Sequence, residues 1–158
     1  MKKTKEFKSK NEAVNHIRIV FPAKSANEAF SRSLIASFIS HLDPTLEELC
    51  DIKTAVSEAV TNCIVHAYND SYSEKERKIM LSAKYTNDGL VTVRIKDNGC
   101  GIQDIEKARE PLYSGSGNDE RSGMGFSIME CFTDKLSVTS TVGKGTTVTL
   151  KKYIGKHE

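Results

Sequence analysis

The sequence predicts an α+β fold, in which a mostly antiparallel or mixed β-sheet carries helices on one face. Segments whose apolar residues alternate with polar ones come in pairs joined by short turns, which is the pattern of β-hairpins. Segments with helical spacing are too few to cross between parallel strands. At 158 residues, the chain is long enough to bury one layered core.

A strand and a helix are expected first. Residues 14–21 (VNHIRIVF) alternate enough to form a strand, and Pro22 closes it because proline cannot donate to a strand ladder. Ser25 and Glu28 have the S-x-x-E spacing of a capping box at a helix start. Apolar residues at helical spacing follow, so we expect this helix to end near Leu42.

A second helix is predicted from Asp43 to about Tyr68. Asp43 is a good N-cap, and Pro44 suits the first helical turn. Apolar residues then recur at three- and four-residue steps, which is the period of an amphipathic helix. Residues 69–77 are polar and are predicted to form a loop.

Two β-hairpins follow. The first covers residues 79–95 and turns at an Asn-Asp-Gly sequence, and the second covers residues 136–153 and turns at Gly-Lys-Gly. Between them, residues 104–110 predict a short helix and residues 123–132 a third main helix.

Composition limits the classes of partner. The 23 Lys and Arg residues nearly balance 21 Asp and Glu, which argues against an extended nucleic-acid face and a direct nucleic-acid partner. No apolar run approaches the roughly 20 residues that a membrane-spanning helix needs, so no membrane partner is expected. Residues 1–12 read as a flexible basic arm, and residues 13–158 as a single domain. The four cysteines form no CxxC pair and are expected to be reduced thiols of a cytoplasmic protein.

The first candidate for chemistry is the pair Glu58 and Asn62. They lie four residues apart on the second helix, so their side chains share a face. An amide oxygen suits Mg²⁺, and a carboxylate one turn away can accept a proton from a hydroxyl. The alternative is a solvated polar face.

The second candidate is the D-x-G-x-G sequence at residues 97–101, directly after a strand. A carboxylate fixed there, at Asp97, can accept a hydrogen bond from the exocyclic amine of adenine, and Gly99 and Gly101 let a flat ring approach the backbone. A simple glycine turn is the alternative.

Two further segments complete the pattern. Ser-Gly-Met-Gly at residues 122–125 opens a helix, whose free N–H groups and dipole suit a phosphate group. Arg121 immediately precedes it and can offset charge on the terminal phosphate, while residues 113–120 are placed to act as a lid. Residues 143–147 (GKGTT) are otherwise a hairpin turn. The chain has neither a P-loop nor a Rossmann fingerprint.

The order of these sequences resembles the N, G1, G2 and G3 boxes of the GHKL superfamily, which includes DNA gyrase, Hsp90-type chaperones, histidine kinases and MutL. Three longer stretches closely resemble the anti-sigma F factors, serine-protein kinases that govern the forespore sigma factor of endospore-forming bacteria. These are LDPTLEELCDIKTAVSEAVTNCIVHAYN, EKAREPLYS and ERSGMGFSIMECF. The resemblance covers roughly residues 14–153 and implies the Bergerat-type ATP-binding fold.

The resemblance also implies a role for each matching residue. Glu58 matches the catalytic base, Asn62 the Mg²⁺ ligand, and Arg121 the arginine at the γ-phosphate. Arg32 falls where the family has an arginine that contacts both sigma factor and antagonist. The other ATP-binding positions are Asp97, Gly99, Gly101, Ser122, Gly123, Met124, Gly125 and Thr146, of which the last supports the aspartate that reads adenine.

The implied function is that of a homodimeric anti-sigma factor and kinase. It binds a sporulation sigma factor and uses ATP and Mg²⁺ to phosphorylate an anti-anti-sigma factor on serine. One alternative is a nucleotide-gated sigma-binding module without phosphotransfer, which the presence of Glu58 disfavours. Another is an anti-sigma kinase of a stress-response sigma factor, which the sequences LDPT, REPLYS and GFSIMECF disfavour. An isolated histidine-kinase domain is disfavoured because no histidine lies in a dimerising helical hairpin.

Overall fold

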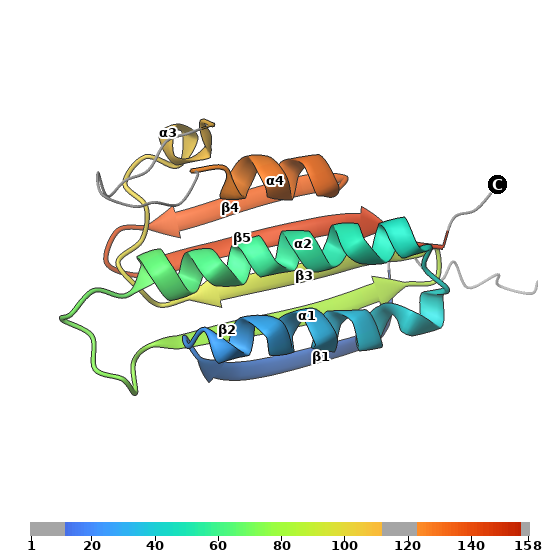
Figure 1. Cartoon of the computed structure of the whole chain (residues 1–158), viewed down its shortest axis with the longest axis horizontal. Coiled ribbons are helices and arrows are strands. Elements are labelled where there is room, and N and C mark those ends of the chain that lie inside the picture. Colours follow the sequence, from blue (N-terminus) through green and yellow to red (C-terminus); the bar gives the residue numbers. More distant parts are fainter. Residues whose placement is uncertain (1–11, 112–122, 156–158) are drawn as a thin grey trace, which may run out of the picture.

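The computed structural model describes residues 12–111 and 123–155 of the chain. Its strands form one antiparallel sheet in the order β1-β2-β3-β5-β4 (Figure 1). The pairs β2–β3 and β4–β5 are the two predicted hairpins, and β5 lies beside β3. The strands are β1 (Ala13–Pro22), β2 (Lys78–Thr86), β3 (Leu90–Asp97), β4 (Lys135–Thr141) and β5 (Gly145–Tyr153).

The main helices lie over one face of this sheet, as Figure 1 shows. The helices are α1 (Ala26–Ile39), α2 (Leu46–Asn62), α3 (Ile105–Arg109) and α4 (Gly125–Phe132), with a 3₁₀ turn at Ser40–Leu42 and a π-helical turn at Cys63–Ala67. This arrangement confirms the predicted α+β fold. In the part of the chain that the structure describes, no helix has the length and apolar character to cross a membrane.

The core lies between the helices and the sheet. Along β3, the alternate residues Val91, Val93 and Ile95 are fully buried, and α2 packs its own buried side chains, such as Val56, into the same core. Burying a side chain of this size stabilises the fold by about 1.5–3 kcal/mol. Asp97 is the next residue in this two-residue period, so the geometry of the strand carries its carboxylate into the interior.

The start of α1 differs from the prediction. Ser25 has a helical backbone, and its side chain makes no capping hydrogen bond, so the predicted capping box is wrong. The carboxylate of Glu28 instead accepts a 2.5 Å hydrogen bond from Ser57 Oγ of α2, a tertiary contact, and pairs with Arg32 one turn further along α1. The competing partner on a neighbouring helix explains why the local pattern failed.

The start of α2 also lies later than predicted. Asp43 has a left-handed backbone, with φ of 51°, and ends the 3₁₀ turn, so it is not the N-cap. Thr45 caps the helix: its Oγ1 accepts the N–H of Glu48 at 3.1 Å, and Glu48 Oε2 accepts the N–H of Thr45 at 2.8 Å. A reciprocal pair of this kind satisfies two N–H groups that the first turn leaves without helical partners.

The last turn of the α2 region widens into the π-helical turn at Cys63–Ala67. Such turns are rare and occur often at functional sites. The carbonyl oxygen of Ala67 accepts the N–H of Cys100 at 2.8 Å. The turn therefore fixes the end of the helix to the segment that follows β3, where the D-x-G-x-G sequence lies.

Candidate functional site

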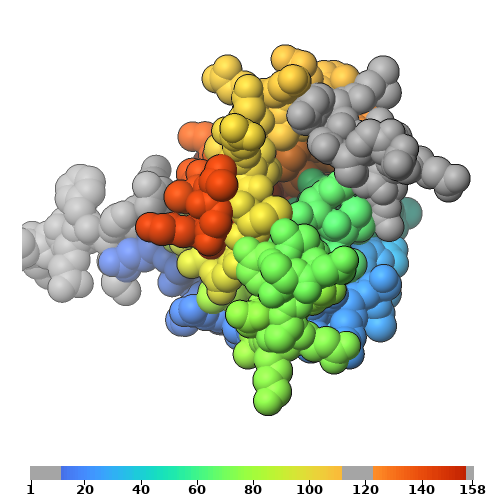
Figure 2. Space-filling view, turned by 90° about the vertical axis from the view of Figure 1, so that its left-hand side faces the viewer, coloured from blue at the N-terminus to red at the C-terminus, as the bar shows by residue number. Residues whose placement is uncertain are grey.

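A pocket of about 1000 Å³ opens at the end of the sheet where β3 finishes. The π-helical turn, the segment from β3 to α3 and the start of α4 border it. Figure 2 views the molecule from this end, with the loop after α2 in green and the segment after β3 in yellow. The pocket brings together residues that the sequence singles out, although they lie far apart along the chain: Asn62, Asp97, Gly101, Gly123, Gly125 and Thr146.

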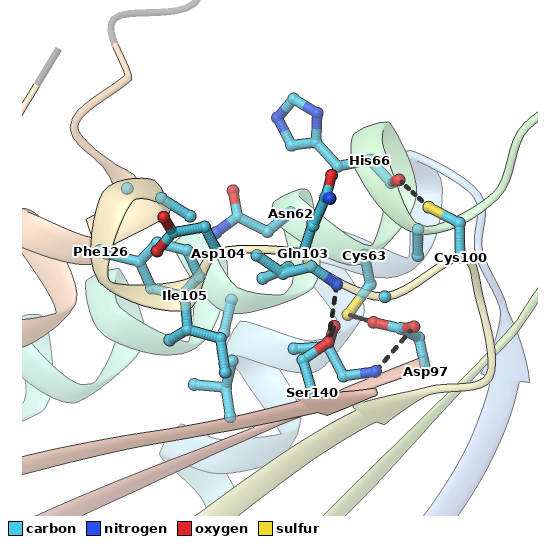
Figure 3. A pocket seen from close by; sticks show the side chains of 18 of the residues that line it. Asn62, Cys63, His66, Asp97, Cys100, Gln103, Asp104, Ile105, Phe126 and Ser140 are labelled. Atoms are coloured by element: carbon cyan, nitrogen blue, oxygen red, sulfur yellow. Dashed lines mark hydrogen bonds between the residues drawn. The ribbon is translucent and has the colours of Figure 1, made fainter. Parts of the chain in front are cut away.

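Asp97 lies at the wall of this pocket and is 4% exposed. Its Oδ1 accepts two backbone N–H groups, from Gly99 at 2.9 Å and Thr146 at 3.3 Å. Its Oδ2 accepts the thiol of Cys63 at 3.5 Å, as the dashed lines of Figure 3 show in part. These contacts, from three different segments, fix the direction in which the carboxylate points.

Burial is the main influence on the pKa values of Asp97 and Cys63. Removal from water raises the pKa of Asp97 above its ordinary value, although the hydrogen bonds from Gly99, Cys63 and Thr146 act in the opposite direction. Burial and the neighbouring carboxylate together raise the pKa of the Cys63 thiol well above its usual range. Cys63 is therefore a protonated thiol that donates to Asp97.

Tyr68 links the two strands that lead into the site. Its hydroxyl group accepts the N–H of Asn98 at 3.0 Å and donates to the carbonyl oxygen of Lys78. The start of β2 is thereby tied to the residue directly after Asp97. The position of the D-x-G-x-G segment depends on this tyrosine as well as on the strand.

The glycines of that segment allow close packing of main chain on main chain. A Cβ on Gly99 would overlap the carbonyl group of Ala67, and a Cβ on Gly101 would overlap that of Thr141. Gly101 also has a φ of +75°, which residues with a side chain rarely adopt. Gly101 lines the pocket, whereas Gly99 packs behind it against the π-helical turn.

Glu58 and Asn62 meet the start of α4. A Cβ on Gly125 would lie 3.3 Å from Asn62 Oδ1 and 3.4 Å from Glu58 Oε2, so both side chains reach the same glycine. Their i, i+4 spacing on α2 places them on one face, as predicted. The absence of a side chain at residue 125 lets the two helices approach while an amide and a carboxylate lie between them.

Gly123 lies two residues before α4 and has a φ of +63°, a left-handed backbone at the turn into the helix. Met124 is the N-cap residue, and its side chain makes no capping bond to the first N–H groups of the helix. Such a helix start favours an anionic group. Arg121, Ser122 and the predicted lid at residues 113–120 lie outside the described residues.

Thr146 supports Asp97 through its backbone. Its N–H donates to the carboxylate, while its hydroxyl group lies 2.8 Å from Ser140 Oγ. Ser140 Oγ also accepts the N–H of Ile102 at 2.7 Å, which holds the segment between β3 and α3 against β4 (Figure 3). Ser140 thus joins two walls of the pocket.

Arg32 lies on α1 and is not part of the pocket lining. Its Nε forms an ion pair with Glu28 Oε1 at 2.8 Å, and its Nη2 donates a hydrogen bond to Glu28 Oε2 at 3.3 Å. Glu28 also accepts the hydroxyl of Ser57, the residue before Glu58 on α2. Arg32 is therefore held on the helical surface, 42% exposed.

A divalent cation would find few protein ligands here. Among the residues that the structure describes, no group of three His, Cys, Asp or Glu side chains could hold a metal ion. Asn62 nevertheless fits Mg²⁺, which keeps several waters and commonly takes one or two protein oxygens together with phosphate oxygens. The Oδ1 of Asn62 and the Oε2 of Glu58 both face the start of α4.

Sequence reasoning missed Cys63, Tyr68 and Ser140 as parts of the site. Each acts on a residue at least six positions away, and Cys63 and Tyr68 act on residues 34 and 30 positions away. No local pattern in the sequence predicts contacts between residues so far apart. The buried, inward-facing place of Cys63 on the α2 periodicity was the only available signal, and it predicts burial alone.

Comparison with known proteins identifies the family to which the chain belongs. Residues 21–152 match the family model of the histidine kinase-like ATPase domain. An anti-sigma F factor of Geobacillus sp. (strain WCH70) is 51% identical over 142 residues, which cover 90% of this chain and 94% of the relative. An anti-sigma F factor of Caldanaerobacter subterraneus subsp. tengcongensis is 48% identical over 143 residues, covering 90% of this chain and 96% of the relative.

A solved structure of the RsbU and RsbW domains of a Mycobacterium tuberculosis protein has a TM-score of 0.65 and 18% identity, covering 89% of this chain and 32% of that one. At this identity the likeness concerns the fold alone. The family model spans most of the chain, and the curated relatives are about half identical over nearly their whole length. The chain therefore belongs to the anti-sigma F factor family of histidine kinase-like ATPases.

Proposed function

We propose that this protein is an anti-sigma factor and serine-protein kinase: it binds a sporulation sigma factor and phosphorylates the antagonist of that factor, using ATP and Mg²⁺. Family membership supports the sigma-factor partner. The observation that carries the nucleotide chemistry is Asp97, a 4% exposed carboxylate at the wall of a pocket that Asn62 also lines. We further propose that the protein acts in the cytoplasm as a homodimer.

Asp97 would select adenine over guanine. An ionised carboxylate only accepts hydrogen bonds, so it attracts the 6-amino group of adenine and repels the carbonyl oxygen that guanine has at the same place. The N–H groups at the start of α4 would bind the phosphates, and the guanidinium of Arg121 would stabilise charge on the transferred group.

Glu58 would orient the serine hydroxyl of the antagonist and take its proton. Its carboxylate and Asn62 reach the same point at the start of α4, so the base and the proposed Mg²⁺ ligand face the place where the phosphates would bind. When bound at Asn62, Mg²⁺ would neutralise charge on the phosphate oxygens. Most of the acceleration would come from positioning and electrostatics, as is usual in phosphoryl transfer.

The nucleotide would also act as a switch. We propose that the ATP form favours the sigma factor and the ADP form favours the antagonist, with Arg32 contacting both. Such a switch requires each partner to bind the two nucleotide states with different affinities.

The test is transfer of label from γ-labelled ATP to the antagonist, comparing wild type with Glu58→Gln. We expect transfer to be lost in Glu58→Gln while ATP binding remains. Glu47→Gln is a matched control, because Glu47 is an exposed carboxylate in the first turn of the same helix. Tight ATP binding without transfer in wild type, in an assay where an active anti-sigma F factor labels the same antagonist, would overturn the kinase and favour a nucleotide-gated binding module.

A further inference from the structure

The hydrogen bonds of Asp97 determine where a ligand can bind to it. An ionised carboxylate has about four acceptor positions, two on each oxygen. The N–H groups of Gly99 and Thr146 occupy both positions on Oδ1, and the Cys63 thiol occupies one on Oδ2. The position that remains is on Oδ2, the oxygen that Cys63 contacts.

Cys63 is built into the wall of the same pocket. It is 4% exposed, and it begins the π-helical turn that the Ala67 carbonyl fixes to the segment after β3. The thiol therefore has little freedom to move away from Asp97. In Figure 3 the sulfur of Cys63 points at one carboxylate oxygen of Asp97. The other oxygen accepts the N–H of Thr146.

We propose that Cys63 is a positioning residue for purine recognition: its thiol directs the free acceptor position of Asp97 Oδ2 towards the 6-amino group of a bound adenine nucleotide. This inference rests on the proposed nucleotide binding. The thiol acts through Asp97 and need not touch the base. A purely structural thiol would fill space, and its loss would affect all purine ligands alike.

The experiment compares two ligands that differ only in the amino group. We would measure the dissociation constants of ATP and of purine riboside triphosphate, which lacks the 6-amino group, for wild type, Cys63→Ala and Cys63→Ser. We expect Cys63→Ala to weaken ATP binding about 3- to 10-fold, which corresponds to the loss of one net hydrogen bond between Asp97 and the 6-amino group. Binding of the analogue should change less than about twofold. Cys63→Ser, which keeps a donor, should restore much of the ATP affinity.

The matched control is Cys50→Ala, which removes an exposed thiol of α2, the helix that leads into the π-helical turn, and should change neither constant. Should Cys63→Ala fail to fold, Cys63→Ser and Cys63→Val give the same comparison, because both fill the space and only serine donates. An equal loss for ATP and the analogue, or no loss for ATP, would overturn the positioning role alone. A wild type that binds no ATP would overturn the proposed function itself.

Discussion

The hydroxyl group of Tyr68 offers a direct test of how the site is held together. It accepts the N–H of Asn98 and donates to the carbonyl oxygen of Lys78, so Tyr68→Phe leaves both main-chain groups without this partner. Both hydrogen bonds are partly buried, and a hydrogen bond of this kind contributes about 0.5–1.5 kcal/mol net to stability. Loss of the two together should lower the free energy of unfolding by about 1–3 kcal/mol.

Tyr85→Phe is the matched control. Tyr68 and Tyr85 are both 8% exposed, but within the described part of the chain the Tyr85 hydroxyl has one hydrogen-bond partner, Asn15, at 3.5 Å. The Tyr85 ring also packs on Phe38, with centroids 5.1 Å apart, and phenylalanine keeps that contact. We expect Tyr85→Phe to cost less than about 0.5 kcal/mol, as for a weak bond near the surface.

Urea unfolding of the two variants and the wild type measures the difference. Because neither change alters the surface exposed on unfolding, the m-value should stay constant and only the midpoint should move. In thermal unfolding, each 1 kcal/mol should lower Tm by about 2–4 °C for a domain of this size. Equal losses for Tyr68→Phe and Tyr85→Phe would refute the reasoning, because the cause would then be a change in ring packing that both share.

Three further changes test the geometry. Asp97→Asn removes a carboxyl whose pKa burial raises above its ordinary value of 3.8, so wild-type stability should fall as pH rises from that value through the raised pKa, while the stability of the variant should not. In urea titrations, the free energy of unfolding of the variant minus that of the wild type should therefore grow with pH. A difference that shrinks with pH would contradict the burial argument. Gly99→Ala should lower the free energy of unfolding by about 1–3 kcal/mol through overpacking, since the new Cβ would lie 2.5 Å from the Ala67 carbonyl carbon. An unchanged urea midpoint would show that the segment after β3 can move away from the π-helical turn without loss of stability. Thr45→Ala should lower the free energy of unfolding, measured by thermal unfolding, by about 0.5–2 kcal/mol, and Ser25→Ala should lower it much less, because of these two residues Thr45 alone makes a capping bond. Similar losses for the two variants would disprove the assignment of Thr45 as the cap.

Much of the fold was predictable because its periodicity is local. The alternation in β2, β3, β4 and β5 gave both hairpins, and the helical spacing gave α1, α2 and α4. The failures occurred where two local signals competed or a distant partner intervened. Asp43 and Thr45 are both good N-caps, and the left-handed backbone of Asp43 decides between them. The carboxylate of Glu28 binds Ser57 of another helix, which no local pattern contains.

In the candidate site, too, local sequence patterns predict some features, while distant contacts determine others. Asp97 was predictable because it ends a strand whose two-residue period points it inward, and Glu58 and Asn62 because four residues bring them to one helical face. The meeting of these groups at Gly125 could be expected only from the resemblance, since it depends on how α4 packs on α2. Cys63 begins a π-helical turn whose last residue, Ala67, accepts the N–H of Cys100, so its place depends on a contact with a distant segment.

Cys100, in the segment after Asp97, is held by main-chain hydrogen bonds, and this has a practical consequence for labelling. The Cys100 N–H binds Ala67, the Cys100 carbonyl accepts from Gly143, and its side chain lies partly exposed at the pocket. A fluorophore attached there would replace only a weak thiol contact to the carbonyl of His66. With the exposed Cys50 and Cys131 exchanged for serine and Cys63 shielded by burial, Cys100 becomes a single attachment point whose emission would report on what enters the pocket.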